Sequence, residues 1–560
     1  MTLHSLKKKL PNIKVYLKEG ALHLEGEVDN YETFLSYGKL AVKLKSRGVV
    51  NDLTIKGLKA KPMREPNVED STLEGKHCDV LIIGAGIVGC AIARELSKSK
   101  VSILVLDKEN DVAVRASSRN DGMVHPGIDI HPGLKKAKYN SRGNRLYTTL
   151  SKELNFDFIR NGSYIVLPKP WMKFVYPIFW LRAKQNGVDG IAYISKKKLS
   201  KLEINVAPWQ CGAVYTPSSG IISPYKVTIA LAENAALNGA EFSFETVVRG
   251  FEKESEEIIK VRTNRGFVYP KVVINAAGVY SDTIAQMADD RFFSIHPRKG
   301  TEIILDKEAS SLTSSVIAKL PFGDVKNHTK GGGLVRTIDK NMLVGPNAVE
   351  TIEREDDSTT REDVEAIFEK HKKVVPSLTE RQLITYFSGT RASTWEEDFI
   401  VEKSKKVNNL IHAAGIQSPG VTAAPAIAED IARFAKEILT NVEMKENFIA
   451  SNPYHPILSK LSLEEKDRLI KQDPSYGRIV CRCEEISEGE IRDALLSPLP
   501  FTPTLDAVKR RCRAGMGRCQ GGFCSPRVFE LIHELRGIET SQIKKGQGLF
   551  APFTVKEDDK

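Results

Sequence analysis

Five of the eight cysteines fall in one short stretch near the C-terminus. Cys481 and Cys483 form a C-x-C pair, and Cys519 and Cys524 form a C-x4-C pair inside a glycine-rich segment. Thiolates bind soft and ferric centres strongly, and four of them complete a [2Fe-2S] cluster. Structural zinc is the alternative, but its usual cysteine pairs are spaced C-x2-4-C, which a C-x-C pair does not match. The pattern therefore predicts a [2Fe-2S] cluster held by these four cysteines.

Glycines and arginines surround the four predicted ligands. The glycines would let backbone N–H groups approach the cluster sulfurs, and the arginines could offset the negative charge of the cluster. The fifth cysteine, Cys512, is expected to be a free thiol, because as a ligand it would replace Cys519 and lose the glycine-lined loop. The surrounding residues are Gly515, Gly517, Gly521, Gly522, Arg478, Arg482, Arg511 and Arg518.

A glycine triplet near the start of the main domain suggests a second kind of chemistry. Gly84, Gly86 and Gly89 follow the apolar run VLII, and Asp107 ends the next apolar run 23 residues after Gly84. The three glycines would permit a tight turn, backbone approach to a pyrophosphate, and close packing of helix on strand. The pyrophosphate would lie at the helix N-terminus, and Asp107 would accept from a ribose hydroxyl. The segment predicts a dinucleotide-binding site.

Strings elsewhere in the chain indicate which dinucleotide is bound. They are ASSRNDGMVHPG from Ala116, VVINAAGVYSD at 272–282 and IHAAGIQSPGVTAAPAIAEDIA at 411–432. With the glycine triplet, they resemble the glycine-oxidase and D-amino-acid-oxidase type of FAD-dependent oxidoreductases. Within this family the chain is most similar to the catalytic subunits of anaerobic glycerol-3-phosphate dehydrogenases, with L-2-hydroxyglutarate dehydrogenases as relatives. Its cysteine-rich tail is similar to their BFD-like [2Fe-2S] domain.

The resemblance implies an FAD site assembled from separated segments. Small residues there would let the backbone approach the cofactor, and a helix N-terminus would stabilise negative charge on reduced flavin. Val248 would hold the adenine through its backbone. The expected FAD-binding residues are Gly84, Gly86, Gly89, Asp107, Lys108, Ser117, Ser118, Asn120, Gly122, Val248, Ala277, Gly278, Gly415, Ser418, Gly420, Val421 and Thr422.

Two residues are expected to act on the substrate. Oxidation of a secondary alcohol needs a base for the hydroxyl proton and a cation for an anionic substrate. By the resemblance, the candidate catalytic residues are His125, in MVHPG, and Arg391, in FSGTRAS. A planar guanidinium suits a carboxylate or a phosphate. Family members often have GLRP where this chain has GTRA, so the pocket can differ beyond the arginine. Lys299 and Lys330 are further candidate substrate-binding residues.

Together these sites predict an FAD-dependent dehydrogenase that oxidises sn-glycerol 3-phosphate to dihydroxyacetone phosphate and passes electrons through the cluster. The expected acceptor is a second flavoprotein or a quinone-linked subunit, not oxygen. A 2-hydroxy acid such as L-2-hydroxyglutarate is the alternative substrate, because phosphate and carboxylate both suit Arg391. In a third interpretation the chain is an electron-transfer or scaffolding subunit that turns over no substrate of its own.

We expect an α/β chain with several domains to position these residues, because 560 residues are more than a single hydrophobic core usually organises. The main domain alternates strands and helices as in an FAD-binding, Rossmann-like doubly wound sheet with an inserted α+β substrate domain. A small N-terminal α+β module has a hairpin, helix, strand layout that resembles the BON domain. The expected boundaries are 1–60 for this module, 61–77 for a linker, 78–440 for the oxidoreductase domain, 441–475 for a second linker, 476–540 for the [2Fe-2S] domain and 541–560 for a tail.

Composition narrows the classes of partner. The net charge of +11 suits an anionic cofactor and substrate, because the lysines are scattered and no basic stripe interleaved with aromatics points to nucleic acid. No apolar run reaches the roughly 18 residues of a membrane span. We therefore expect a cytoplasmic protein that can associate peripherally with the inner face of the cell membrane.

Overall fold

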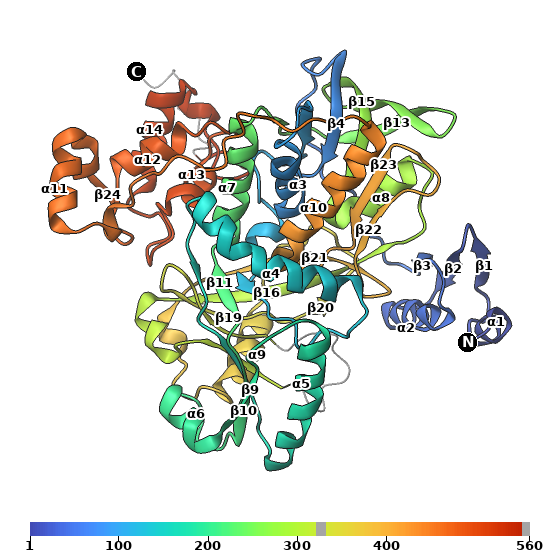
Figure 1. Ribbon diagram of the computed structural model, residues 1–560, viewed down its shortest axis with the longest axis horizontal. Helices are drawn as coiled ribbons and strands as arrows, with labels where there is room; N and C mark the ends of the chain where they lie inside the picture. Colours follow the sequence, from blue (N-terminus) through green and yellow to red (C-terminus); the bar gives the residue numbers. More distant parts are fainter. Residues whose placement is uncertain (321–331, 551–560) are drawn as a thin grey trace.

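The computed structural model describes residues 1–320 and 332–550. A central region built on two large sheets carries a small N-terminal module on one side and a mostly helical C-terminal domain on the other (Figure 1). Within the described residues, no helix is both long enough and apolar enough to cross a membrane.

The N-terminal module has the expected order of hairpin, helix and strand. Strands β1 (Lys14–Lys18) and β2 (Ala21–Val28) form the hairpin, and β2 pairs in parallel with β3 (Val49–Ile55). Helix α2 (Tyr31–Ala41) begins where the Asn30 side chain accepts from the Thr33 N–H, and α1 (Leu3–Lys9) precedes the hairpin. Likeness to the BON domain stays a prediction.

The first large sheet is the predicted dinucleotide-binding sheet. Its parallel strands place their carboxyl ends at one edge, where a doubly wound sheet binds its ligand. Antiparallel strands extend the sheet from two of the parallel strands. The parallel strands are β12 (Glu241–Ser243), β5 (Ile103–Leu106), β4 (Lys76–Ile83), β15 (Gly266–Asn275) and β23 (Leu410–Ala414), and β13 (Val248–Glu254), β14 (Glu257–Thr263) and β22 (Ile400–Lys403) pair antiparallel.

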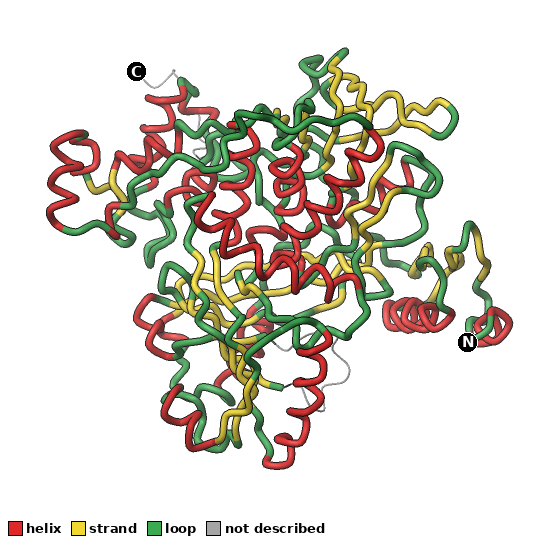
Figure 2. Tube along the Cα trace, in the orientation of Figure 1, coloured by secondary structure: helices red, strands yellow, loops and turns green. Residues whose placement is uncertain are grey.

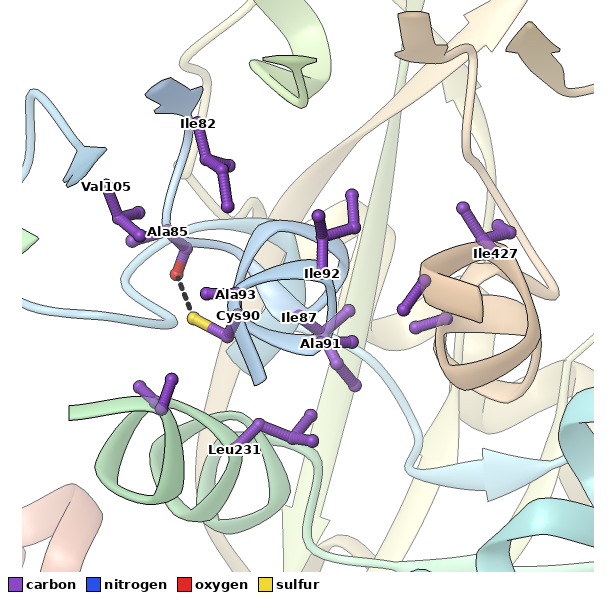
Figure 3. Packing of buried hydrophobic residues seen from close by; sticks show 14 of the residues in the cluster. Ile82, Ala85, Ile87, Cys90, Ala91, Ile92, Ala93, Val105, Leu231 and Ile427 are labelled. Atoms are coloured by element: carbon purple, nitrogen blue, oxygen red, sulfur yellow. Dashed lines mark hydrogen bonds between the residues drawn. The ribbon is translucent and has the colours of Figure 1, made fainter. Parts of the chain in front are cut away.

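One face of this sheet is covered by helices that carry many small residues. Helix α3 (Ile87–Leu96) packs between α7 (Pro224–Leu237) and α10 (Gly420–Leu439), and α4 (Lys135–Glu153) packs on α10. Figure 3 shows this core, with Leu231 of α7 and Ile427 of α10 beside α3. The Cys90 thiol there donates to the Ala85 carbonyl at 3.4 Å. Small side chains let the helices approach closely, which fixes the turn that precedes α3.

The inserted region forms the second large sheet, which runs through the lower part of the molecule with helices on both sides (Figure 2). The helices α5 (Tyr176–Gln185), α6 (Lys196–Leu202) and α9 (Arg361–Lys372) flank it. A small sheet of β6 (Met123–Val124), β7 (Phe158–Ile159) and β11 (Gly220–Ile222) joins the two regions. The strands of the second sheet are β8 (Ser163–Val166), β9 (Ala192–Ser195), β10 (Gly212–Thr216), β16 (Ile295–Leu305), β17 (Val316–Lys319), β18 (Gly333–Arg336), β19 (Met342–Gly345), β20 (Val349–Glu350) and β21 (Leu383–Thr394).

The C-terminal domain contains more regular structure than its sequence suggested. The segment expected to be a linker, 441–475, includes α11 (Leu463–Gln472), which Ser462 and Glu465 begin with a capping box. The domain buries Leu499 and Phe501 in the core of the dinucleotide-binding region. It is therefore joined to the central region by packing as well as by chain. Its other elements are β24 (Ile479–Cys481), β25 (Ile486–Ser487), α12 (Glu488–Leu495), α13 (Leu505–Cys512) and α14 (Ser525–Arg536).

Candidate functional site

The turn between β4 and α3 opens onto a cavity of about 180 Å³. The ends of β4, β5 and β15 and the start of β13 meet there, as the parallel sheet predicts. Many of the expected FAD-binding residues line it together, although they are far apart in the sequence. They are Gly84, Gly86, Asp107, Lys108, Ser117, Val248, Ala277 and Gly278.

The glycines of the turn are required by close backbone approach. Gly84 has a φ of 113°, and a Cβ there would lie 2.4 Å from the Ala276 carbonyl oxygen. A Cβ on Gly89 would lie 1.9 Å from the Gly84 carbonyl oxygen. No side chain fits at such distances, so strand and helix can be this close only with glycine. Gly86, which precedes the first turn of α3, lines the cavity, so the positive end of this helix lies there.

Asp107 holds the turn as well as lining the cavity. Its Oδ2 accepts from the Ala85 N–H at 2.6 Å, and its Oδ1 accepts from the Glu109 N–H at 2.8 Å. Burial, reinforced by the negative charge of Glu109, raises the pKa of this carboxyl to about 6. Its remaining lone pairs could still accept from a ribose hydroxyl.

The serines and Asn120 form hydrogen bonds that shape the loop after the turn. The Ser117 Oγ accepts from the Ile87 N–H at 2.9 Å, and Ser118 donates to the Arg115 carbonyl. The Asn120 Oδ1 accepts from the Gly122 N–H at 3.0 Å. Ser118, Asn120 and Gly122 lie outside the lining of the cavity. Their expected contacts with FAD stay predictions.

Sequence analysis missed a set of charged residues around the same cavity. Glu109 is 3% exposed and lies 2.6 Å from Arg64 of the first linker and 2.8 Å from Arg115. Lys108 pairs with Glu109 and with Glu355. The three cations hold the pKa of Glu109 at about 2 despite its burial. Arg115 could have been predicted at the cavity, because it lies two residues before Ser117 in the sequence. Arg64 and Glu355 come close to Glu109 and Lys108 only through the fold.

The expected flavin-edge segment at the start of α10 meets the loop that carries His125. The Thr422 Oγ1 accepts from the His125 N–H at 2.9 Å, and a Cβ on Gly122 would lie 2.3 Å from the Ile222 carbonyl oxygen. Asn144 of α4 donates to the His125 carbonyl at 3.0 Å. The residues expected around the flavin at this point are Gly415, Ser418, Gly420, Val421 and Thr422, all at or just before the N-terminus of α10.

Strands β16 and β21 place Arg391 on the side of the second sheet that faces this loop. A Cβ on Gly300 would lie 2.4 Å from the Arg391 Nη2, so the guanidinium lies across β16. Both terminal nitrogens donate to the Asn347 carbonyl at 3.4 Å. Among the residues that the structure describes, no carboxylate forms an ion pair with Arg391, which leaves its charge available to an anion.

Glu302 is a buried carboxyl that sequence analysis did not single out. It lies two residues after Gly300 on the same face of β16, and it is 1% exposed. Its Oε2 has no hydrogen-bond partner in the described part of the chain. Burial raises its pKa well above the usual range, Asp121 adds to this effect and Arg391 opposes it. No local pattern marks it, because its surroundings come from three separate segments.

The two lysines expected at the substrate differ in outcome. Lys299 is 7% exposed, and its Nζ lies 3.0 Å from Asp356 at the wall of the first cavity. Its charge is therefore already matched by a carboxylate. Lys330 lies outside the described residues.

The four predicted cluster ligands converge as two pairs. The Cys483 and Cys519 sulfurs are 3.7 Å apart, and a hydrogen bond with Cys524 lowers the pKa of Cys481. Two pairs of thiols suit a two-iron cluster, in which each iron takes two thiolates. A Cβ on Gly517 would lie 2.3 Å from the Cys483 Cβ, so glycine is needed beside the ligands. Within the described residues, no three His, Cys, Asp or Glu side chains are grouped for a single ion.

Cys512 and the nearby arginines have other partners. The Cys512 thiol donates to the Val508 carbonyl of its own helix at 3.4 Å, and burial raises its pKa to about 12. Arg478 pairs with Glu488, Arg511 with Asp111, and Arg518 with Asp306. These three arginines therefore balance carboxylates first, which weakens the expectation that they offset the charge of a cluster.

Two protein families match this chain. The family described as FAD dependent oxidoreductase matches residues 79–434, and that described as BFD-like [2Fe-2S] binding domain matches residues 479–534. The second match includes all four paired cysteines.

Relatives and a solved structure agree with these matches. A glycerol 3-phosphate dehydrogenase of Caloramator mitchellensis is 40% identical over 83% of this chain and 96% of its own length. One component of the anaerobic glycerol-3-phosphate dehydrogenase of Escherichia coli K12 is 23% identical over 84% of this chain and 91% of its own. The dithionite-reduced L-α-glycerophosphate oxidase of Mycoplasma pneumoniae, with FAD bound, aligns with a TM-score of 0.64 and 28% identity, covering 68% of this chain and 100% of its own.

Proposed function

The chain belongs to the FAD dependent oxidoreductase family, and from this premise we propose that it oxidises sn-glycerol 3-phosphate to dihydroxyacetone phosphate. It also carries a BFD-like [2Fe-2S] domain. Bound FAD supplies a two-electron acceptor, and the cluster supplies a one-electron carrier. A relative that is 40% identical along nearly its whole length is a glycerol 3-phosphate dehydrogenase, which favours this substrate.

The observation that carries the proposal is the available charge of Arg391. Its guanidinium lies across Gly300 on the face of the second sheet that looks towards the His125 loop. A planar guanidinium can bind two oxygens of a phosphate at once, which orients the substrate as well as holding it. Lys299 is a weaker candidate, because Asp356 already pairs with it.

His125 is the proposed acceptor of the hydroxyl proton. Its backbone is held by Thr422 of α10 and by Asn144 of α4, so the side chain starts from a fixed position. An imidazole titrates near neutral pH, which suits general-base work. The hydroxyl proton would pass to His125 and bound FAD would accept the carbon-bound hydrogen as hydride, so that a ketone would remain.

The cysteine pairs imply that electrons leave one at a time to another protein. As that partner we propose a second flavoprotein or a quinone-linked subunit. Support comes from the likeness to one component of an anaerobic dehydrogenase, whose designation implies further components.

Anaerobic reduction of the flavin tests the substrate. The enzyme is mixed with sn-glycerol 3-phosphate or L-2-hydroxyglutarate, and flavin absorbance is followed. We expect rapid bleaching by sn-glycerol 3-phosphate only. Faster bleaching by L-2-hydroxyglutarate would instead favour that compound as the substrate, as in the 26% identical L-2-hydroxyglutarate dehydrogenase of Nematostella vectensis. Bleaching by neither would favour a carrier without turnover.

Two variants separate the proposed roles. Arg391→Lys should raise KM far more than it lowers kcat, because one charge remains but paired hydrogen bonding is lost. His125→Asn should lower kcat and remove its dependence on pH near neutrality. Stoichiometric peroxide formation in air at full turnover rate would contradict a dehydrogenase that depends on a partner.

A further inference from the structure

One buried arginine connects two parts of the molecule. The first is the cysteine loop, residues 513–524 with the neighbouring Glu484. The second is the flavin side, which comprises the turn between β18 and β19 and the start of α7. Arg513 follows α13 directly, is 9% exposed, and has a φ of 71°. Non-glycine residues adopt this left-handed conformation rarely, and it persists where surrounding contacts hold it. The contacts of the Arg513 side chain supply that support, in two directions.

In one direction the guanidinium holds the cysteine loop. Its Nε donates to Glu484 at 2.9 Å, and Glu484 directly follows the ligand Cys483. Glu484 is 6% exposed and also pairs with Lys307 of the second sheet region at 3.1 Å. The Nη1 of Arg513 lies 3.4 Å from the sulfur of Met516 in the same glycine-rich segment. This one side chain therefore contacts Glu484, next to Cys483, and Met516, which precedes Cys519 in the glycine-rich segment.

In the other direction the same guanidinium holds the turn between β18 and β19. Its Nη1 lies 2.9 Å from Asp339, and its Nη2 donates to Asn341 at 3.0 Å. Nη1 also contacts the hydroxyl of Tyr225 at 3.2 Å. Tyr225 lies in the first turn of α7, and its hydroxyl is 3.4 Å from the Met516 sulfur.

Residues next to Tyr225 contact the loop from Gly122 to His125, which we expect beside the flavin. Pro224, which precedes it, would lie 3.2 Å from a Cβ on Gly122. The Ile222 N–H donates to the Gly122 carbonyl at 2.9 Å, and β11 pairs with β6, which ends one residue before His125. The contacts thus run from Glu484 through Arg513 to the segment that we expect beside the flavin.

We propose that Arg513 is a positioning residue that fixes the cysteine loop against the flavin side, and that this fixed geometry sets the rate of electron transfer between the two centres. Each transfer removes one electron from reduced flavin and adds one to the cluster, and an external one-electron acceptor empties the cluster between transfers. The inference rests on both cofactors of the proposed function and not on the identity of the substrate.

The test uses the full-length holoenzyme and four variants. Arg513→Ala removes both sets of contacts, and Arg513→Lys keeps the charge without the branched geometry. Asp339→Asn weakens the pairs of Asp339 with Arg513 and with Lys226 of α7, and it leaves the contacts of Arg513 with Glu484 and Met516 in place. Lys544→Ala is the matched control, because Lys544 pairs with Glu245 across the same interface, at 3.5 Å, without contacting Arg513.

Iron content is measured first, and electron transfer is then followed without oxygen. Rapid mixing with sn-glycerol 3-phosphate reports flavin reduction by absorbance, and rapid freezing reports cluster reduction by electron paramagnetic resonance. Hydrogen exchange of residues 513–524 reports the order of the loop independently of turnover. A parallel run reduces the flavin with light and EDTA, so that failure of the substrate does not prevent the measurement.

We expect Arg513→Ala and Asp339→Asn to slow cluster reduction about tenfold or more, with flavin reduction unchanged, because small misplacements of reacting centres have large effects on rate. Arg513→Lys should be intermediate, and Lys544→Ala should match the natural protein. The proposal would be overturned if Arg513→Ala and Asp339→Asn, both with full iron content, reduced the cluster at the rate of the natural protein. If Arg513→Ala loses iron, Asp339→Asn decides the outcome alone. Lack of bleaching by sn-glycerol 3-phosphate counts only against the proposed substrate.

Discussion

The N-terminal module and the C-terminal domain are attached to the same central region by different physical means. They lie on opposite sides of it (Figure 1). The N-terminal interface is organised around the aromatic side chain of Trp395 and also contains ion pairs such as Arg47 with Asp290 and Arg291 with Asp52. The C-terminal interface has at its centre a buried carboxylate, Asp111, that two arginines bind at short distance. The two interfaces should therefore fail under different conditions.

Trp395 is the centre of the N-terminal interface. Its ring stacks on His296 with centroids 4.2 Å apart and planes 8° apart, and it joins the core of the module. Its indole N–H donates to Ser294 at 3.1 Å, and the same hydroxyl accepts from Asn51 of β3 at 3.0 Å. Burial of the apolar surface around Trp395 contributes an attraction that needs no particular charge.

Asp111 is the centre of the C-terminal interface. It is 1% exposed and accepts from Arg510 at 2.7 Å and from Arg511 at 2.8 Å. The guanidinium of Arg511 also lies 3.6 Å from the centre of the Phe501 ring. Buried charges cost desolvation energy, so such an interface is stable only while every partner is present. It gains a defined geometry, which an electron-transfer domain requires.

The largest expected effect comes from breaking the C-terminal interface. Asp111→Ala leaves two buried arginines without their carboxylate, and we expect it to cost about 3–5 kcal/mol of unfolding free energy. Urea unfolding followed by fluorescence and by cluster absorbance should show the cluster domain lost first. A cost below about 1 kcal/mol would mean that solvent reaches the pair and that the two interfaces are alike.

A single methyl group should weaken the N-terminal interface. A Cβ on Gly38 of α2 would lie 2.3 Å from the Trp395 ring, so Gly38→Ala forces the ring to move. Overpacking of this kind costs about 1–3 kcal/mol, and alanine returns up to about 1 kcal/mol of helix propensity, so we expect a net loss of about 1–2 kcal/mol.

Protease cleavage in residues 61–77 measures this loss separately from global unfolding. The double variant Gly38→Ala with Trp395→Leu should cost less than the sum of its two single variants, because the smaller side chain makes room for the methyl group. Strict additivity of the two losses would contradict the steric explanation.

One carboxyl at each interface should respond to pH in the direction opposite to the other. Glu396 beside Trp395 has an enclosed Oε1, and burial raises its pKa from 4.5 to about 7. The folded state therefore holds the proton more tightly, and stability falls as pH rises from 4.5 to 7. Allowing for partial exposure, Glu396→Gln should stabilise the N-terminal interface by about 1 kcal/mol at pH 8 and flatten this dependence.

Asp111 provides the contrasting case. Its two arginines lower its pKa below 3.8 in spite of burial. Its contribution to the stability of the folded protein is present above pH 3.8, and it is lost as pH falls through the lowered pKa of the folded state. Thermal unfolding from pH 3 to 8, with proteolysis reporting each interface, checks both directions. Burial lowers the pKa of His296 from 6.5 to about 4, so this residue weakens the same interface as pH falls below 6.5. The test therefore compares the natural protein with Glu396→Gln, and identical pH dependences of the two would contradict the assignment of Glu396.

The smallest effect should come from an exposed ion pair at the edge of the C-terminal interface. Glu308 lies 3.7 Å from Arg518, and both side chains are mostly exposed. Solvent screens such pairs strongly, so Glu308→Ala should leave the midpoint of thermal unfolding unchanged within error. A clear shift would mean that the periphery of this interface contributes as its buried pairs do.

Much of the chemistry could be predicted from local sequence. The turn glycines, Asp107 and the four cysteines follow rules of spacing. In the structure Gly84, Gly86 and Asp107 line one cavity, and the Cys483 sulfur lies 3.7 Å from that of Cys519. The helix α11 was missed because its segment is mostly charged, although Ser462 and Glu465 form a capping box that is visible in the sequence. Of the two serines expected to bind FAD, Ser117 lines the cavity and accepts from Ile87, whereas Ser118 lies outside its lining and donates to Arg115.

The sequence by itself determined the kinds of site in this protein, because a glycine triplet and a set of thiols act through residue type and spacing within one segment. Only the tertiary structure decided how these sites are joined. The contacts of Arg513, the enclosure of Glu302 and the pairing of Asp111 each bring together segments a hundred residues or more apart. Burial and electrostatic pairing depend on such distant neighbours, and no pattern within one segment records them.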